Sequence, residues 1–282
     1  TQSCGCLAKE IRSNLAKKMK FRALPEGEAV FNKILGSIKN NAKSRNLKWD
    51  LSKEKAKDLL GSRCFYCGAI PKSHNRNPSY KELNGDFPSN GIDRIDNTKG
   101  YTEDNVVPCC KLCNQVKYTL TIDEFRDSIK RIYNYSILKK QVVQINHNPI
   151  KNWERNQGSR TLPKGTAAFN YLIRIYKNGA KKRKIDWNLT DKETRNIMNL
   201  PCYYCGKSPE LKIPITQKQC NGYFLSNGLD RINSDKGYTE DNVVPCCKYC
   251  NIAKSNLTID EFRDHIMKIY KHFIEKSELK KE

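Results

Sequence analysis

The segment GYTEDNVVPCCK occupies residues 100–111 and recurs without a change at residues 237–248. Upstream of it, SNGIDRID at 89–96 is matched by SNGLDRIN at 226–233. The chain therefore contains one long sequence pattern twice. Solenoid repeats have periods of roughly 20–50 residues, and this period is much longer, so the sequence predicts two tandem domains rather than a repeat array.

The repeats also define the segments that lie outside them. Residues 1–23 have no counterpart in the second half of the chain, and residues 141–161 are polar and contain Pro149 and Gly158, as a linker would. Each repeat has about 115 residues, which is long enough for a domain that folds alone. We therefore expect a basic N-terminal extension at 1–23, a first domain at 24–140, a linker at 141–161 and a second domain at 162–282.

Each repeat begins with a basic amphipathic stretch, at about 25–46 and again at about 163–184. In the first stretch Phe31, Ile34 and Leu35 are spaced as on one face of a helix, and Lys and Arg residues fall on the other face. The second stretch has the same pattern. We predict a basic helix at the start of each domain.

Short polar signals mark where the later elements begin. Ser52 and Thr190 are candidate N-caps of a second, short helix. The segment LTIDEFRD, at 120–127 and at 257–264, contains a Thr followed three residues later by Glu, which is the capping-box pattern of a last helix. Between these helices we expect a β-hairpin around Gly-Tyr-Thr and a helix that opens at the second cysteine pair. The predicted fold class is α+β, with two small domains that each combine a β-hairpin and helices.

Cysteine pairs indicate metal binding. The chain has 13 cysteines, and an odd number with C-x-x-C pairs argues against a secreted disulfide framework and for zinc in a reducing compartment. Four thiolates make a closed tetrahedral zinc site that contributes folding energy and leaves no open position for chemistry. Redox or unligated thiols are the alternative. We predict two structural zinc ions, held by Cys64, Cys67, Cys110 and Cys113, and by Cys202, Cys205, Cys247 and Cys250.

The remaining five cysteines fit no such pair. Cys109 and Cys246 stand beside the predicted ligands and are expected to be buried as small hydrophobic residues. Cys220 has no counterpart in the first repeat and is expected to be structural. Cys4 and Cys6 belong either to an ordinary tail or to a metal site that a partner completes.

The charge of the chain points to a polyanionic partner. The sequence has 52 Lys and Arg against 30 Asp and Glu, a formal net charge of +22. Such a surplus is typical of proteins that bind nucleic acid or an anionic membrane face. No run of about 18 apolar residues exists, so no transmembrane helix is expected. We predict that basic residues at the ends of the two basic helices contact nucleic acid, and the alternative is that they form a solvated charged face. These residues are Lys39, Lys43, Arg45, Lys181, Lys182 and Arg183.

The order of motifs resembles a known family. Within each repeat C-x-x-C is followed by D-R-I, then G-Y-x-x-x-N-V, then C-x-x-C-N-x-x-K. This order is similar to that of the zinc-containing HNH endonucleases, and it covers most of both repeats. The resemblance implies a ββα-metal, treble-clef-like core in each domain. It also implies that the protein derives from metal-dependent nucleases.

The resemblance assigns site residues by position. It places Asp93 and Asp230 as hairpin ligands of a catalytic Mg²⁺, with Asn114 and Asn251 as the ligands on the following helix. The family's motif asparagine, which supports the catalytic region, corresponds to Asn105 and Asn242. The general-base histidine corresponds to Arg94 and Arg231.

An arginine at the general-base position changes the expected chemistry. A guanidinium stays protonated and cannot accept a proton from water. No histidine is shared by the two repeats, since the four in the chain are His74, His147, His265 and His272. We interpret Arg94 and Arg231 as phosphate-binding residues, because their planar donor groups match phosphate oxygens. The alternatives are that they pair with nearby aspartates and brace the hairpin, or that catalysis proceeds with an unrecognised base.

Our leading hypothesis is a catalytically inactive, zinc-stabilised nucleic-acid-binding protein built from two degenerate HNH-like domains. We favour RNA over DNA, together with protein partners in a large assembly such as a ribosome, although the sequence does not decide this. The alternative is an active endonuclease of homing or phage type that cleaves DNA with Mg²⁺. A protein-interaction scaffold is a third reading. Whether the chain is an enzyme is left open, with inactivity favoured.

The cysteines also bear on location. Reduced thiols indicate an intracellular, reducing compartment. The chain begins with Thr1 rather than Met, so we expect that it has been processed or trimmed. This leaves a mitochondrion, a plastid or a virion as further settings.

Overall fold

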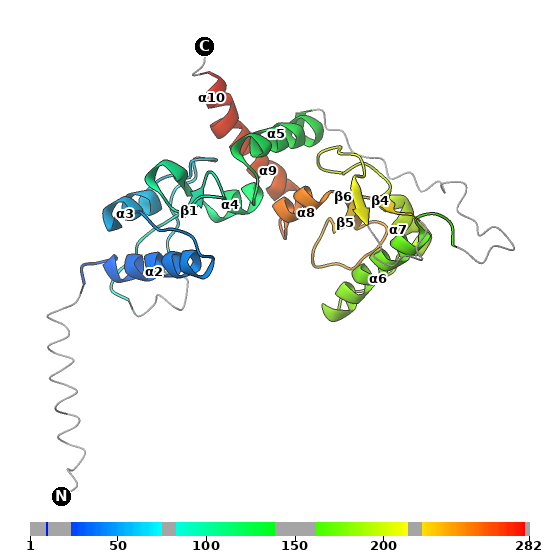
Figure 1. The fold of residues 1–282 in the computed structure, drawn as a ribbon, viewed down its shortest axis with the longest axis horizontal. Helices are drawn as coiled ribbons and strands as arrows, with labels where there is room; N and C mark the ends of the chain where they lie inside the picture. Colours follow the sequence, from blue (N-terminus) through cyan, green and yellow to red (C-terminus); the bar gives the residue numbers. More distant parts are fainter. Residues whose placement is uncertain (1–9, 11–23, 75–82, 139–161, 214–221, 280–282) are drawn as a thin grey trace, which may run out of the picture. The chain divides into compact units, whose positions relative to one another are not determined.

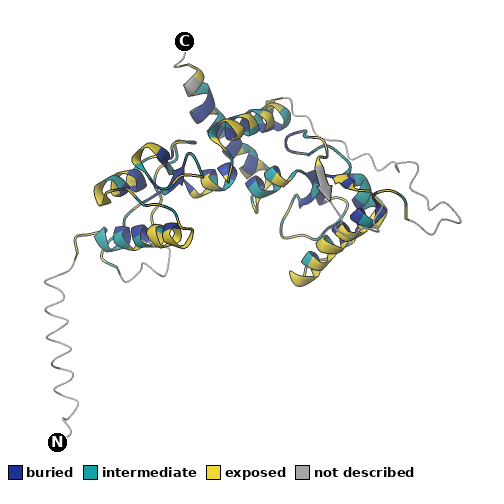
Figure 2. Cartoon of the chain, in the orientation of Figure 1, coloured by how far each residue is buried: buried dark blue, intermediate teal, exposed yellow. Residues whose placement is uncertain are grey.

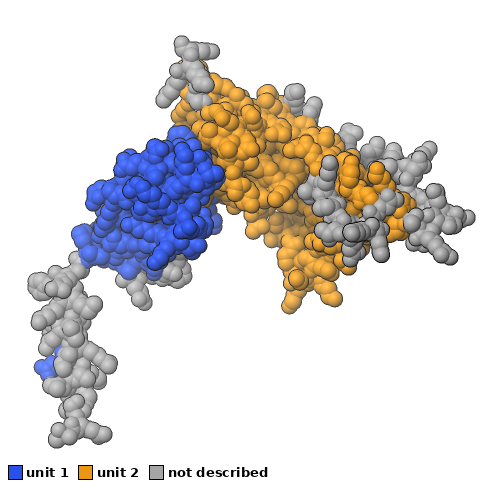
Figure 3. Space-filling view, in the orientation of Figure 1, with its two compact units in different colours: residues 1–111 blue, residues 112–282 orange. Residues whose placement is uncertain are grey.

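The computed structural model describes residues 10, 24–74, 83–138, 162–213 and 222–279. The chain divides into two compact units, residues 1–111 and residues 112–282 (Figure 3). The division falls inside the first repeat, so the compact units and the sequence repeats partition the chain differently. The expected domain limits at 24–140 and 162–282 stay a prediction. The linker at 141–161 and, apart from Glu10, the extension at 1–23 lie outside the described residues.

The first unit consists of helices on a small hairpin. Its elements are α2 (Glu28–Ser44), α3 (Lys53–Gly61), β1 (Gly91–Arg94), the 3₁₀ turn η2 (Glu103–Asn105) and β2 (Val106–Cys109). Helix α2 buries Val30, Phe31 and Leu35 in a cluster that also contains residues of α3 and the hairpin. The predicted basic helix at 25–46 is therefore present as α2.

The second unit repeats this order after two helices (Figure 1). Helix α4 (Lys111–Lys117) leads into it, followed by α5 (Ile122–Ile132) and the π-helical turn η3 (Tyr133–Leu138). The second copy of the pattern comprises α6 (Thr166–Lys182), α7 (Asp191–Met198), β3 (Leu211–Ile213), β4 (Phe224–Ser226), β5 (Gly228–Arg231), β6 (Val243–Cys246), α8 (Lys248–Lys254), α9 (Ile259–Ile269), η4 (Tyr270–Glu275) and α10 (Lys276–Glu278).

Side-chain caps fix the starts of the short helices as the sequence predicts. The Ser52 hydroxyl accepts a hydrogen bond from the Lys55 amide, and Thr190 accepts from Glu193 within a capping box. Thr121 and Thr258 form the predicted capping boxes at the starts of α5 and α9. Each cap satisfies amide groups that would otherwise lack a partner in the first turn.

The two hairpins of the repeated segment have the same register. In the first, Gly91 pairs with Cys109 and Arg94 with Val106. In the second, β5 and β6 pair antiparallel in the corresponding way, from Gly228 to Arg231. A further short antiparallel pair, β3 with β4, precedes the second hairpin. Among the described residues the architecture is mixed helix and sheet, and each sheet is a small antiparallel pair of strands. This agrees with the α+β class.

The helical faces are divided as the amphipathic pattern predicts. Helix α6 buries Phe169, Leu172 and Ile173 against α7 and the second hairpin. Its opposite face and its C-terminal end are exposed (Figure 2). Trp187 lies at the edge of this core, and its indole nitrogen donates to the Leu189 carbonyl at 2.9 Å.

Within the second unit, residues at matching positions of the two repeats contact one another. The rings of Tyr133 and Tyr270, which are 137 positions apart, stack with centroids 3.7 Å apart and planes within 5°. Gln115 donates to the carbonyl of Ile252, its own counterpart, at 3.2 Å. Lys130 of α5 also pairs with Glu278 of α10 at 2.6 Å, although these two positions do not match. The helices that follow the two cysteine segments therefore pack on each other.

None of the described helices combines the length with the apolar composition that a membrane crossing requires.

Candidate metal centres and the adjoining pocket

The eight predicted zinc ligands gather into two groups of four thiols. Their sulfur atoms lie within 4.8 Å of one another in each group. Cys67 Sγ and Cys110 Sγ are 3.7 Å apart, and Cys205 Sγ and Cys247 Sγ are 3.8 Å apart. Each group draws one pair from a turn before the hairpin and one pair from the end of the second strand and the helix that follows.

These groups fit zinc. Zinc–sulfur bonds of about 2.3 Å in a tetrahedron place neighbouring sulfurs about 3.8 Å apart, which is close to the observed distances. The thiols are mostly buried and four in number, so a bound ion would have no open coordination position. The two groups could therefore each hold one structural zinc ion. They would cross-link the cysteine turn, the hairpin and the following helix, and so supply folding energy rather than chemistry.

Within the second unit, other side chains lie beside three of the predicted zinc ligands, Cys113, Cys205 and Cys247. His265, on α9, lies with Nε2 3.4 Å from Cys113 Sγ and is buried. A pocket of 270 Å³ places Glu124 and Arg131 of α5 beside Cys205 and Cys247. Outer contacts of this kind orient metal ligands. Sequence reasoning missed His265, because its counterpart in the first repeat is Ser128 and no local pattern points to a cysteine 152 positions away.

The other cysteines are only partly described. Cys109 and Cys246 are buried beside the ligand groups, as predicted for small hydrophobic residues. Cys4, Cys6 and Cys220 lie outside the described residues.

The motif asparagines clamp the loop of each hairpin. Asn242 Oδ1 accepts from the Asn233 amide at 2.9 Å, and its Nδ2 donates to the carbonyls of Asn233 and Gly237 at 3.0 and 2.8 Å. Asn105 makes the same three bonds, to Asp96 and Gly100. Both side chains are buried. The two side-chain amides therefore hold the backbone of the loop that follows Arg94 in β1 and Arg231 in β5.

The arginines that follow the hairpin aspartates point into the same loops. Arg94 Nη1 donates to the carbonyls of Asn97 and Lys99, and Arg231 Nη1 donates to those of Ser234 and Lys236 at 2.5 and 2.6 Å. The Arg231 guanidinium carbon lies 5.4 Å from the ring centre of Tyr238. Both arginines therefore donate to backbone carbonyls of the loop that follows them.

The second hairpin aspartate lies in a buried polar cluster. Asp230 Oδ2 accepts from Tyr204 Oη at 2.6 Å and from Lys254 Nζ at 3.0 Å. Lys254 Nζ also donates to the Arg231 carbonyl at 3.1 Å, and its side chain is completely buried. Burial raises the pKa of Asp230, while the hydrogen bonds from Tyr204 and Lys254 oppose that rise. Burial also raises the pKa of Tyr204, so its hydroxyl stays protonated and donates.

Lys254 was not among the predicted site residues. It is the last residue of the C-x-x-C-N-x-x-K motif, and it lies four positions after Cys250 on the buried face of α8. Lys117, at the matching position of the first repeat, is also completely buried. The first hairpin aspartate, Asp93, accepts from Tyr66 Oη at 2.7 Å, as Asp230 does from Tyr204. A signal existed in the sequence, since a lysine at this helical spacing from a ligand cysteine faces inward.

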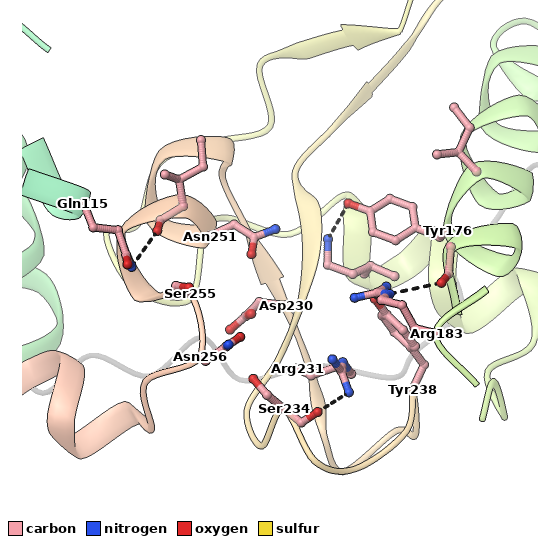
Figure 4. Close-up of a pocket in the computed structure, with 14 residues that line it drawn as sticks. Gln115, Tyr176, Arg183, Asp230, Arg231, Ser234, Tyr238, Asn251, Ser255 and Asn256 are labelled. Carbon is pink, nitrogen blue, oxygen red and sulfur yellow. Dashed lines mark hydrogen bonds between the residues drawn. The ribbon is translucent and has the colours of Figure 1, made fainter. Parts of the chain in front are cut away.

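A pocket of 660 Å³ opens beside this cluster (Figure 4). It is lined by Gln115, Ile175, Tyr176, Gly179, Arg183, Leu229, Asp230, Arg231, Ser234, Tyr238, Asn251, Ile252, Ser255 and Asn256. The structure thus brings three predicted residues of the second repeat, Asp230, Arg231 and Asn251, to one cavity. Arg183, predicted as a nucleic-acid contact, lies there too, and its Nη2 donates to Tyr238 Oη at 3.1 Å.

The charges around the pocket do not favour a Mg²⁺ ion. Magnesium is usually bound through one or two carboxylates, and among the described lining residues Asp230 supplies one. The Asp230 charge is already compensated by Lys254. Arg183, Arg231 and Lys254 together carry three positive charges against the one negative charge of Asp230, a net +2. This balance favours an anion over a divalent cation.

The remaining predicted site residues lie at the surface. Lys39, Lys43 and Arg45 are exposed at the C-terminal end of α2, and Arg45 Nη2 donates to Tyr101 Oη at 3.2 Å. Lys181 and Lys182 are exposed at the corresponding end of α6. Asn114 is exposed on α4.

No histidine in the described part of the chain lines the pocket. His74 is tied to a loop, with Nε2 2.8 Å from the Ser89 hydroxyl, and His265 contacts Cys113. His272 lies 3.3 Å from Lys276 Nζ on the C-terminal helical segment. His147 lies outside the described residues.

Comparison with known proteins finds two relatives of the chain. One is R423, an uncharacterized protein of Acanthamoeba polyphaga mimivirus, which is 31% identical over 222 residues, covering 79% of this chain and 34% of that protein. The other, from Bacillus subtilis (strain 168), is named as a candidate HNH endonuclease derived from the SPbeta prophage, YoqL. It is 26% identical over 163 residues, covering 56% of this chain and 65% of that protein.

The chain thus spans less than two thirds of the length of either relative. No family model matches the chain, and no solved structure matches it significantly. One of the two relatives is thus named as an HNH endonuclease. This name agrees with the motif order and with the two groups of four cysteines in this chain.

Proposed function

We propose that this protein is a zinc-stabilised, nucleic-acid-binding member of the HNH-like group in which the second repeat has lost the catalytic base. One observation carries the proposal. The residue after Asp230 is Arg231, whose guanidinium is bonded to two loop carbonyls, and none of the histidines that the structure describes lines the pocket that both residues share. General-base catalysis needs a group with a pKa near the working pH, and a guanidinium does not provide one.

The same reasoning extends to the whole chain. The exact repetition of the motif supports a tandem duplication with arginine in place of histidine in both copies, at Arg94 and Arg231. The net charge of +22 and the exposed basic ends of α2 and α6 support binding to a phosphate backbone. The name of the Bacillus relative supports DNA as the partner, whereas the preference for RNA and a ribosomal setting stay predictions.

The experiment incubates the full-length, zinc-loaded protein with supercoiled plasmid and with structured RNA, in Mg²⁺ and in Mn²⁺. We expect no cleavage of either substrate. We also expect affinity for duplex DNA that falls steeply as salt concentration rises, because backbone binding releases counterions. Cleavage by the wild type that is absent in Asn242→Ala would contradict the proposal.

A second function is favoured by one finding. The Bacillus relative is named as a candidate endonuclease, and Asp230, Asn242 and Asn251 are retained here. In that case the chain would be an active endonuclease that uses an unrecognised base. The cleavage experiment separates the two functions, because only the second predicts linear or nicked plasmid.

A further inference from the structure

The most unusual feature of the pocket is the lysine behind its carboxylate. Lys254 reaches Asp230 from the buried face of α8, and its ammonium has the Asp230 carboxylate and the Arg231 carbonyl as partners. The Lys254 side chain is completely buried. A lysine is almost never fully buried unless its charge is paired, and here the pairing partner is Asp230. The protein therefore contains its own cation at the aspartate where the family resemblance would put a metal ligand.

The open side of the pocket carries positive charge and therefore favours an anion. Arg183 and Arg231 both project into it and are held at a single side chain, Tyr238 (Figure 4). Arg183 is anchored through Nε to the Gly179 carbonyl at 3.0 Å and through Nη2 to Tyr238 Oη. Arg231 is anchored through Nη1 to the loop. Two guanidinium groups with fixed positions form a preorganised anion site, because little side-chain entropy is left to lose on binding.

We propose that the Lys254 ammonium replaces a divalent cation at Asp230, behind the wall of this pocket, so that Arg183 and Arg231 bind a backbone phosphate of nucleic acid without Mg²⁺. This inference rests on the proposed function for the identity of the ligand. It adds that the site is metal-independent and names the groups responsible. Neutral donors from Asn251 and Asn256 line the same pocket and complement the two guanidinium groups.

The first measurement asks whether Asp230 binds a divalent cation. Full-length wild type and Asp230→Asn are titrated with Mn²⁺, and bound ion is followed by electron paramagnetic resonance. We expect the two proteins to bind the same amount of Mn²⁺. A bound ion in the wild type that is lost in Asp230→Asn would overturn the inference.

The Lys254→Met variant provides the converse test. Removing the ammonium exposes the carboxylate charge, so we expect a gain of about one Mn²⁺ per chain, as for a site built on a carboxylate. The gain should disappear in Lys254→Met/Asp230→Asn. A folded Lys254→Met protein without this gain would show that Lys254 does not replace a cation. If that variant does not fold, the comparison of wild type with Asp230→Asn still decides.

The second measurement follows binding to a fluorescent DNA duplex at fixed ionic strength, with and without Mg²⁺. We expect wild-type affinity to be the same in both conditions. The Arg183→Gln/Arg231→Gln variant should lower the slope of log affinity against log salt by about 1.8, from two contacts of about 0.9 each. The matched control, Lys192→Gln/Lys271→Gln, removes the same charge from exposed residues that do not line the pocket and should change the slope less.

The outcomes separate the two proposals. Binding that requires Mg²⁺ would overturn the inference and leave the proposed function intact. No DNA or RNA binding in either condition would refute the proposed function, and the Mn²⁺ titration would still report on Lys254. An Arg183→Gln/Arg231→Gln slope equal to that of the wild type would show that the phosphate is not held in this pocket.

Discussion

The pair formed by Lys254 and Asp230 makes a prediction about stability. Replacing Lys254 with Met removes the ammonium but keeps most of the side-chain volume. Asp230 then keeps the hydrogen bond from the Tyr204 hydroxyl, at 2.6 Å. The side chains of Lys254 and Asp230 are 0% and 8% exposed, so water cannot solvate the remaining charge well.

The size of the effect follows from this burial. Removing one partner of a buried ion pair typically costs about 3–5 kcal/mol, because an uncompensated charge stays in the interior. The double variant Lys254→Met/Asp230→Asn removes both charges and keeps an amide that can accept from Tyr204. We therefore expect it to be more stable than Lys254→Met, with a coupling energy of about 2–3 kcal/mol.

The assay is chemical denaturation with zinc held at a fixed concentration, at pH 5 and at pH 8. Without Lys254 the pKa of Asp230 in the folded state rises further above its unfolded value. A raised folded-state pKa means that stability falls as pH increases through the window between the two values. Lys254→Met should therefore lose less stability, relative to wild type, at pH 5 than at pH 8.

Three results would refute this reasoning. A loss below about 1 kcal/mol at pH 8 is the range of an exposed ion pair, and it would mean that the charges are solvated. An equal loss at both pH values would mean that the carboxylate does not titrate in response to the lysine. A loss in the double variant as large as in Lys254→Met would assign the effect to packing instead.

Three further predictions concern other parts of the chain. Asn242→Ala should cost about 1–3 kcal/mol in denaturation, because it leaves buried loop groups unpaired, whereas the exposed Asn256→Ala should be nearly neutral. Cys202→Ser should lower bound zinc from two ions per chain to one by atomic absorption and reduce the melting temperature; two retained ions would exclude Cys202 as a ligand. Hydrogen bonds from the backbone amide and the hydroxyl of Thr258 lower the pKa of Glu261. The stabilising contribution of Glu261 is therefore present above its unfolded-state pKa and is lost as pH falls through its folded-state pKa. In a plot of unfolding free energy against pH, Glu261→Gln should flatten the curve below pH 4.5, and an unchanged curve would count against the cap.

Local signals account for the part of the structure that the sequence predicts. The caps at Ser52 and Thr190, the capping boxes at Thr121 and Thr258 and the amphipathic faces depend on residues a few positions apart. The cysteine groups are similar, since a C-x-x-C turn already holds two ligands together. These features could be predicted because the spacing itself constrains the geometry.

The missed features depend on contacts between distant segments. Lys254 takes its role from Asp230 and Tyr204, which are 24 and 50 positions away, so the motif lysine alone did not reveal its partner. The phosphate-binding role predicted for Arg231 stays a prediction, and the sequence did not reveal that its Nη1 donates to two backbone carbonyls of the adjoining loop. A side chain with several donors can satisfy them in many ways, and only the folded loop determines which.

The stacking of Tyr133 on Tyr270 has a consequence of its own. Contacts between matching positions of two copies are what a two-fold symmetric homodimer produces, and there a single substitution changes both halves at once. Here both positions belong to one polypeptide, so each can change alone. His265, which contacts Cys113 where the other copy has Ser128, is such a one-sided change. Because both matching positions lie in one polypeptide, the two faces of the pairing can differ in sequence, as they do at His265 and Ser128.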